Sequence, residues 1–295
     1  MMYLISYIIL YPFIFLMSRM PFWLAYLVSD LLYYISYYII RYRKKEVFYN
    51  LQLVFPEKSE KEITQIAKDF YAHFGDMLLE SVKTFAMSEQ EFEKRYHFKN
   101  QEIFLELAKK DKSIALVGAH YANWEWGILL NKKMPHQFFG AYNKLKNPYF
   151  DALIRKSRGK FGSILMATNE TSALVRNNIN HHILSTYVLV SDQSPMIQKA
   201  QYWRNFMGIK VPVHIGAETL AKKYDLAVVF FDVEKIKRGY YEVTFKLIAE
   251  DASLYKNFEI TDRYIDIVEA QIKRKPSLYF WTHKRWKHKD KAPIN

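Results

Sequence analysis

The residues after position 100 alternate between short apolar runs and longer amphipathic stretches, and this alternation limits the possible folds more than any other feature of the sequence. The apolar runs are typical of buried strands and occur at 114–117, 138–142, 164–166, 183–190 and 227–233. The amphipathic stretches are typical of helices and occur at 102–109, 124–132, 148–156, 170–178, 214–223 and 262–273. Strands that alternate with helices predict a mainly parallel sheet covered on both faces.

A turn signal at 237–239, Lys-Arg-Gly, separates the run at 227–233 from another at 241–247. It predicts a hairpin, and therefore an antiparallel edge on the parallel sheet. Capping signals that begin at Ser59 and Ser88 predict that residues 1 to about 99 are helical. The expected fold class is α/β, with a mainly parallel mixed sheet flanked by helices and a helical N-terminal region.

Two apolar runs, at 1–17 and 22–40, precede a basic cluster at 41–45. Each run approaches the roughly 20 residues that a helix needs to cross a bilayer. Because Pro12 and Asp30 interrupt them, we expect one anchor helix and one interfacial segment within residues 1–45. The first run lacks the flanks of a cleaved signal peptide, and the basic cluster predicts that the domain at 46–295 lies on the cytoplasmic side. The alternative is a buried apolar hairpin in a soluble protein.

His120 directly follows the apolar run that ends at Gly118, and Glu125 comes five positions later. The carboxyl end of a strand is where an open α/β sheet places its ligand-facing groups. An imidazole can take a proton from a hydroxyl near neutral pH, and a carboxylate on its other nitrogen fixes the tautomer. Residues five apart in a regular helix point in different directions. The two side chains can therefore meet only if His120 lies in a non-helical turn before the helix.

Several kinds of chemistry are excluded or disfavoured by missing residues. The chain has no cysteine, which excludes thiolate nucleophiles and cysteine-ligated zinc. It also lacks a GxSxG elbow, so we expect direct attack by a substrate hydroxyl rather than a covalent acyl-enzyme. Walker and GxGxxG motifs are absent, and the adjacent His181 and His182 have no carboxylate cluster beside them. We therefore expect no cofactor and no metal.

The chain carries 43 Lys and Arg against 30 Asp and Glu, a net charge of +13. This charge favours anionic partners such as nucleic acid, acidic proteins or phospholipid headgroups. The basic tail at 283–291 lacks a recognisable nucleic-acid-binding module, so we expect no nucleic acid and a solvated or membrane-facing tail.

The run Gly118 to Glu125 resembles the HX4(D/E) motif of glycerolipid-type acyltransferases, and more specifically the late acyltransferases of bacterial lipid A biosynthesis, the lauroyl and myristoyl transferases. Other stretches are similar to that family in order and spacing, so that the resemblance covers nearly the whole chain: Asn50-Leu51 with Phe55-Pro56, Tyr142 to Gly162, Ser191 to Gln193, Phe206 to Gly208, and Pro276 to Lys287.

The resemblance implies roles for particular residues. It makes His120 the general base and Glu125 the carboxylate that orients it. It marks Arg158 and Asp192 as further site residues; Arg158 would clamp a phosphate or stabilise the oxyanion, and Asp192 follows the strand at 183–190 and would face the same crevice. Gln193 is a neighbouring hydrogen-bonding candidate.

The chain departs from the family pattern at two places. Relatives commonly carry an arginine soon after the Tyr142 equivalent, where this chain has Asn143-Lys144, so Lys144 is the candidate for that charge. Phe206-Met207-Gly208 replaces a more usual Phe-Phe-Gly, which bears on the acyl pocket.

The resemblance implies an inner-membrane acyltransferase that moves a fatty acyl chain from acyl carrier protein to a hydroxyl of a lipid A precursor. Two alternatives remain open at the level of sequence. An acyltransferase for another lipid, such as a glycolipid, aminolipid or lysophospholipid, would share every motif. In a non-enzymatic basic protein that binds membranes or nucleic acid, His120 and Glu125 would be incidental.

Overall fold

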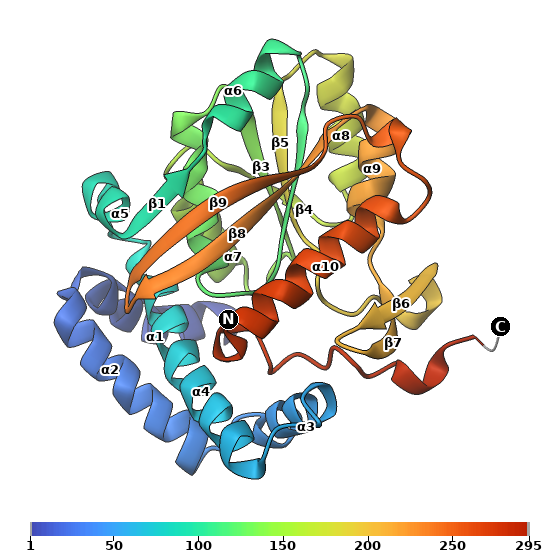
Figure 1. Cartoon of the computed structure of the whole chain (residues 1–295). Helices are drawn as coiled ribbons and strands as arrows, with labels where there is room; N and C mark the ends of the chain where they lie inside the picture. Colours follow the sequence, from blue (N-terminus) through green and yellow to red (C-terminus); the bar gives the residue numbers. More distant parts are fainter. Residues whose placement is uncertain (1, 294–295) are drawn as a thin grey trace.

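The computed structural model describes residues 2–293, and the side chains of all of these except 128, 129 and 131–133. Met1 and residues 294–295, which the expected domain bounds include, lie outside the described residues. The centre of the molecule is a seven-stranded sheet with the order β1-β9-β8-β2-β5-β3-β4 (Figure 1). Its strands are β1 (Tyr96–Lys99), β2 (Ile114–Gly118), β3 (Gln137–Tyr142), β4 (Ile164–Ala167), β5 (Ser185–Val190), β8 (Ala227–Lys237) and β9 (Tyr240–Ala249).

All neighbouring strands in this sheet are parallel except β8 and β9, which form the expected antiparallel hairpin. In Figure 1, α10 lies in front of the sheet and α7 lies behind it. The α/β class predicted from the alternating pattern is therefore confirmed. The helices that connect or flank the strands are α5 (Glu89–Arg95), α6 (Glu102–Lys109), the 3-10 helix Trp124–Lys133, α7 (Pro148–Gly159), α8 (Thr171–Asn180), α9 (Gly216–Tyr224) and α10 (Glu259–Arg274).

Two short strand regions differ from the sequence-based expectation. β1 was expected to be helical, but it pairs with the edge strand β9, and Tyr96 at its start is buried in the core. A separate two-stranded sheet, β6 (Tyr202–Phe206) and β7 (Ile209–Val213), lies between β5 and α9 in the chain, where no strand was predicted. Both regions are too short to show a clear alternation, so their tertiary partners determine their structure.

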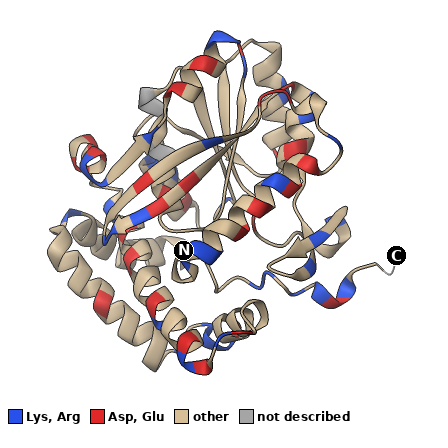
Figure 2. Ribbon diagram, in the orientation of Figure 1, with Lys and Arg blue, Asp and Glu red and all other residues tan. Residues whose placement is uncertain are grey.

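Four helices form the N-terminal region: α1 (Met2–Arg19), α2 (Phe22–Tyr34), α3 (Lys44–Val54) and α4 (Glu60–Lys83). α1 is 18 residues long and apolar enough to cross a membrane, and only 6% of these residues are buried. α2 continues through the π-helical segment Ile35–Ile39 and is bent by 85° from α3. Figure 2 shows few charged residues on α2. The predicted capping box of α4 is present at Ser59 and Glu62.

Charged contacts fix the N-terminal helices to the tip of the β8–β9 hairpin. Arg238 donates to Asp30 of α2 through Nη2, at 2.6 Å, and to Asp76 of α4 through Nε, at 2.9 Å. Ser29 of α2 also donates to Asp76, at 2.8 Å. Because β8 is parallel to β2 and ends near this tip, the carboxyl edge of the sheet faces α2 and α4.

The basic C-terminal segment was expected to be solvated or membrane-facing; Lys284 and Lys287 are exposed as expected, but the expectation was wrong for the residues between them. Arg285 and Trp286 are each 1% exposed. Trp286 stacks on Phe206, with ring centroids 5.6 Å apart, and on Trp281, with centroids 5.9 Å apart. The aromatic residues between the charges therefore draw the segment into the core, because burying them removes large apolar surfaces from water.

Gly118, the last residue of β2, generates a testable prediction about the core. A Cβ atom at this position would lie 2.2 Å from the ring of Phe231, which is 3% exposed. We expect Gly118→Ala to lower the free energy of unfolding by about 1–3 kcal/mol, as overpacking of a dense core does. Thermal and denaturant unfolding of the purified protein measure this change.

Two further variants make the prediction specific. Phe231→Leu should restore part of the lost stability in the Gly118→Ala background, because it removes the clashing ring atoms. Gly159→Ala is the matched control, because nothing lies within 4 Å of its added Cβ. Equal stabilities of Gly118→Ala and Gly159→Ala would contradict the close contact.

Candidate active site

The two strands at the centre of the sheet bring His120 and Asp192 together. β2 and β5 pair in a register that sets Gly118 opposite Val190, so the residues two positions beyond each strand emerge side by side. His120 Nδ1 lies 2.6 Å from Asp192 Oδ1, and the His120 backbone N–H donates to the same oxygen at 3.2 Å. The structure therefore brings both residues into contact at the carboxyl edge of the sheet.

The electrostatics of this pair suit a proton acceptor. Burial of the imidazole opposes its charged form, but the neighbouring Asp192 carboxylate outweighs this effect and raises the pKa of His120. Burial likewise opposes the charge of Asp192, and His120 outweighs it and lowers the pKa of that carboxyl. With Nδ1 directed at an ionised carboxylate, the neutral ring carries its proton on Nδ1 and leaves Nε2 free for a substrate. The His120 side chain is 21% exposed, so a ligand can reach it.

Two aromatic rings pack beside the imidazole. The Trp124 ring lies 5.0 Å from the His120 ring, and the Phe280 ring lies 6.1 Å from it, as measured between centroids. Trp124 and Phe280 also contact each other edge to face, at 5.6 Å. These contacts limit rotation of the ring about its side-chain bonds, which keeps Nδ1 directed at Asp192.

Glu125 does not hold the imidazole, in contrast to the role implied by the resemblance. Its Oε2 accepts a hydrogen bond from Arg158 Nη2 of α7 at 2.5 Å, and both side chains are 26% exposed. His120 lies in the expected non-helical turn, and Glu125 lies in the first turn of the following 3-10 helix, where its side chain extends toward α7. Glu125 affects His120 only through its charge, which helps raise the pKa of the imidazole.

The remaining predicted residues are not joined to these two pairs. Lys144 is exposed in the loop between β3 and α7, and Gln193 is half-buried beside Asp192. Neither side chain has a hydrogen-bond or ion-pair partner within residues 2–293. The structure thus brings together four of the six predicted site residues as two contacting pairs, His120 with Asp192 and Arg158 with Glu125.

A C-terminal segment holds the loop that carries His120 from one side. The backbone N–H of Ala122 donates to the Leu278 carbonyl at 2.9 Å, and that of Phe280 donates to the His120 carbonyl at 3.1 Å. Ala122 has a positive φ of 50°, which turns the chain sharply between these bonds. Asn50 of α3 donates in turn to the carbonyl oxygens of Trp281 and His283, at 2.9 and 3.0 Å. Two of the stretches noted for their family resemblance therefore serve to hold the loop that carries His120.

Glu80 of α4, which was not predicted from the sequence, supports the same loop from the other side. It is completely buried. Its Oε2 accepts hydrogen bonds from Asn123 Nδ2 at 2.7 Å and from the Tyr241 hydroxyl at 2.8 Å, and its Oε1 accepts one from the Tyr26 hydroxyl at 2.9 Å. The available signal was a carboxylate on the apolar stripe of an amphipathic helix, where a charge requires partners.

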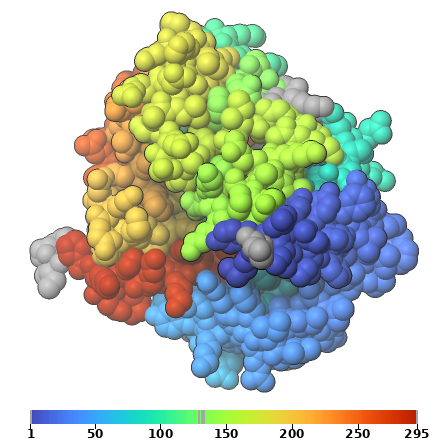
Figure 3. Space-filling view, turned by 180° about the vertical axis from the view of Figure 1, so that it is seen from behind, coloured from blue at the N-terminus to red at the C-terminus, as the bar shows by residue number. Residues whose placement is uncertain are grey.

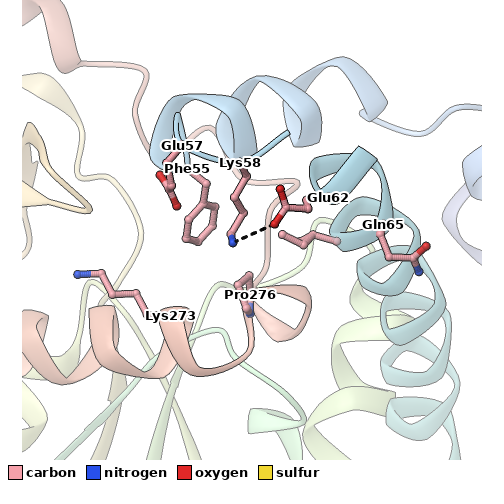
Figure 4. A pocket seen from close by; sticks show the side chains of 8 residues that line it. Phe55, Glu57, Lys58, Glu62, Gln65, Lys273 and Pro276 are labelled. Carbon is pink, nitrogen blue, oxygen red and sulfur yellow. Dashed lines mark ion pairs between the residues drawn. The ribbon is translucent and has the colours of Figure 1, made fainter. Parts of the chain in front are cut away.

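No metal site is found in the part of the chain that the structure describes, where no three His, Asp or Glu side chains gather closely enough to hold an ion. A hollow of about 500 Å³ lies between the end of α3, α4 and the end of α10 (Figure 4). Phe55, Lys58 and Pro276 are among the residues that line it, and Lys58 pairs with Glu62 at 3.8 Å. None of the six predicted site residues lines this hollow, so we do not assign the hollow to the candidate active site.

The pKa of Glu80 generates a testable prediction. Burial, reinforced by Asp76, raises the pKa of Glu80 to about 7 in the folded protein, against about 4.3 for an exposed glutamate. Folding therefore takes up a proton between these values, and the contribution of Glu80 to stability falls as the pH rises through this window. Since glutamine cannot titrate, the stability of Glu80→Gln relative to the unmodified protein should increase from pH 5 to pH 8, by a few kcal/mol at most.

Thermal unfolding of both proteins at the two pH values measures this change. Glu60→Gln, at the exposed start of the same helix, is the control and should show no such trend. A stability difference between Glu80→Gln and the unmodified protein that is the same at pH 5 and pH 8 would contradict titration of Glu80 in this range.

Comparison with known proteins gives one family. No match is found among curated proteins. A family model described as bacterial lipid A biosynthesis acyltransferase matches residues 2–288, a span that includes both side-chain pairs, the C-terminal segment that closes the loop, and α1. The chain therefore belongs to the bacterial lipid A biosynthesis acyltransferase family.

Proposed function

We propose that this acyltransferase moves a fatty acyl chain from acyl carrier protein to a hydroxyl of a lipid A precursor, with His120 as the general base. The observation that carries the proposal is the His120–Asp192 pair, which leaves Nε2 of a partly exposed imidazole free at the carboxyl edge of the sheet. The family match supplies the type of reaction.

The proposed reaction is a direct transfer in two steps. The acceptor oxygen attacks the thioester carbonyl while His120 Nε2 takes its proton, and a tetrahedral oxyanion forms. The oxyanion then collapses, the carbon–sulfur bond breaks, and the imidazolium returns the proton to the leaving thiolate. Asp192 stabilises the imidazolium between these steps, as a carboxylate does in other acid–base pairs.

The Arg158–Glu125 pair has a separate role in this proposal. An arginine held by one carboxylate can direct its remaining N–H groups toward developing negative charge. Glu125 would hold Arg158 so that the guanidinium stabilises the oxyanion or an anionic group of a substrate. Lys144 and Gln193 are proposed as additional substrate contacts, because both flank this edge of the sheet in sequence.

The donor and the absence of an acyl-enzyme are proposed on chemical grounds. The net charge of +13 suits an acidic carrier protein and a phosphorylated acceptor alike. The chain has no cysteine, and within the described residues the His120 ring is hydrogen-bonded to Asp192 and not to a serine. A hydroxyl of the acceptor, activated by His120, is therefore the simplest nucleophile.

Residues 1–45 are proposed as the membrane anchor, and residues 46–295 as the domain on the cytoplasmic side of the inner membrane. The proposal is supported by the exposed apolar surface of α1 and by the basic residues between Arg41 and Lys45. Such an anchor would hold the crevice near lipids whose hydroxyl groups lie at the membrane surface.

The mechanism is tested with variants of the proposed base and its partner. His120→Ala should lower kcat by roughly 10²–10⁴-fold, the usual contribution of a general base. Asp192→Asn should also lower kcat, and because it removes the carboxylate that raises the pKa of His120, the acidic limb of the kcat/KM profile should move to lower pH. Transfer of a labelled acyl chain from acyl carrier protein, measured in membranes from pH 5 to pH 9, provides both quantities.

Asp262→Asn is the control for these variants, because Asp262 pairs with Arg204 away from the candidate site. It should leave the rate and the pH profile unchanged. Full activity of His120→Ala would exclude His120 as the base, and an unshifted acidic limb in Asp192→Asn would exclude Asp192 as its partner.

The acceptor is tested separately by mass spectrometry of the lipids of a deletion strain. We expect lipid A to lose one secondary acyl chain, and expression of the unmodified chain, but not of His120→Ala, to restore it. Intact lipid A together with the loss of an acyl chain from another lipid would transfer the assignment to a different acceptor.

A further inference from the structure

A groove between α1 and α7 is separate from the site described above. It has a volume of about 350 Å³ and opens between the second half of α1, the segment after α4 and one face of α7. Figure 3 shows α1, in dark blue, running beside the yellow-green segment that includes α7. The start of α1 is fixed to the start of α7, because Asn147 donates to the Tyr3 carbonyl and the Ser6 hydroxyl, each at 3.1 Å.

The groove is apolar along one part and cationic along the other. The apolar surface comes from Ile14 and Phe15 of α1, from Phe85 in the segment after α4, and from Leu153 of α7. The part of the groove near the C-terminal ends of α1 and α7 is lined by Arg19, Lys156 and Lys160. Among the described residues, no acidic side chain lines the groove. The helices run side by side from their first turns, so the three cations gather where both helices end.

Two of these cations have no anionic partner within the described residues. The Arg19 guanidinium lies over the Phe15 ring, 3.6 Å from its centroid, and Lys156 is exposed at the end of α7. Lys160 is engaged differently, since its ammonium donates to the Met87 carbonyl at 2.5 Å. Arg19 and Lys156 are therefore available to an external anion.

The surroundings of the groove indicate where that anion comes from. α1 forms one wall, and its outward side exposes large apolar side chains such as Phe13 and Leu16, which are 66% and 62% exposed. A helix with this composition would face the acyl chains of a bilayer. A ligand that enters from there would bring an apolar chain to the first part of the groove and a charged headgroup to the second.

We propose that this groove binds an anionic phospholipid, with its phosphate between Arg19 and Lys156 and the first methylenes of one acyl chain against Ile14 and Leu153. The groove is too small for a whole phospholipid, so the remainder of the lipid stays in the bilayer. The binding does not depend on the proposed reaction. Its consequence for the enzyme is positional, because Ser157 lines the groove and the next residue, Arg158, holds Glu125.

The proposal is tested by native mass spectrometry of the full-length protein in a mild non-ionic detergent. The protein is titrated with phosphatidylglycerol and, in parallel, with zwitterionic phosphatidylcholine. We expect the first phosphatidylglycerol molecule to bind more tightly than phosphatidylcholine. The double variant Arg19→Gln/Lys156→Gln should weaken that binding by roughly 10- to 30-fold, since each basic residue near an anionic lipid contributes about five-fold.

Two further variants separate the groove from general surface charge. Leu153→Trp fills the apolar part without changing the charge and should weaken the binding of both lipids. Lys61→Gln/Lys109→Gln removes two exposed lysines outside the groove and should change the affinity by less than two-fold. If the double variant of the groove does not fold, the single substitution Lys156→Gln at the exposed end of α7 should still weaken binding by about five-fold.

Three results would overturn the proposal. The control pair could weaken phosphatidylglycerol binding as much as the groove pair, which would mean that the lipid binds through general surface charge. All groove variants could bind as the unmodified protein does. A lipid A precursor could displace the first phosphatidylglycerol from the unmodified protein with a groove-dependent affinity, which would assign the groove to the acceptor.

Discussion

The parallel pairing of β2 with β5 is the constraint on which the candidate site depends. The two strands are distant in sequence, and their register brings His120 and Asp192 side by side, with His120 Nδ1 2.6 Å from Asp192 Oδ1. A shift of one residue would turn the side chains of one strand to the opposite face. The close contact of Gly118 with Phe231 opposes such a shift, because a side chain at the end of β2 would crowd that ring. The position of the His120–Asp192 pair therefore depends first on the packing of the sheet.

The loop between His120 and Glu125 has little regular secondary structure. It is held in place by side chains and backbone groups from three distant parts of the chain. Asn123 of the loop and Tyr241 of β9 both donate hydrogen bonds to Glu80, and residues 278–280 bond to the loop backbone. Each of these contacts fixes a group that would otherwise be an unpaired polar atom in the interior. The same buried carboxylate accepts a hydrogen bond from Tyr26 of α2, so the N-terminal helices and the catalytic loop share one partner.

The elements predicted correctly from the sequence are those whose residue pattern is local and extends over enough residues to be recognised. The bounds of α6 agree with the prediction, and the capping box at Ser59 is present. His120 and Asp192 lie just beyond the ends of two neighbouring strands, as predicted. The errors have a common cause, since each depends on a partner far away in the chain. β1 is a strand because β9 lies beside it, Arg285 is buried because its neighbouring tryptophans pack inward, and Glu125 pairs with Arg158 because α7 is close. Spacing within a motif cannot reveal which of two carboxylates will reach a histidine.

The hydrogen bonds between the His120 loop and residues 278–280 also impose an order on biosynthesis. α1 is translated before the sheet, whereas the segment that closes the loop is made long after β2 and β5. A domain folds as a unit, so a nascent chain would hold β2 and β5 before the segment that supports the His120 loop exists. The loop that carries His120 would gain its support only when the C-terminal residues dock, and a chain shortened before Leu278 would lack the hydrogen bonds that hold this loop.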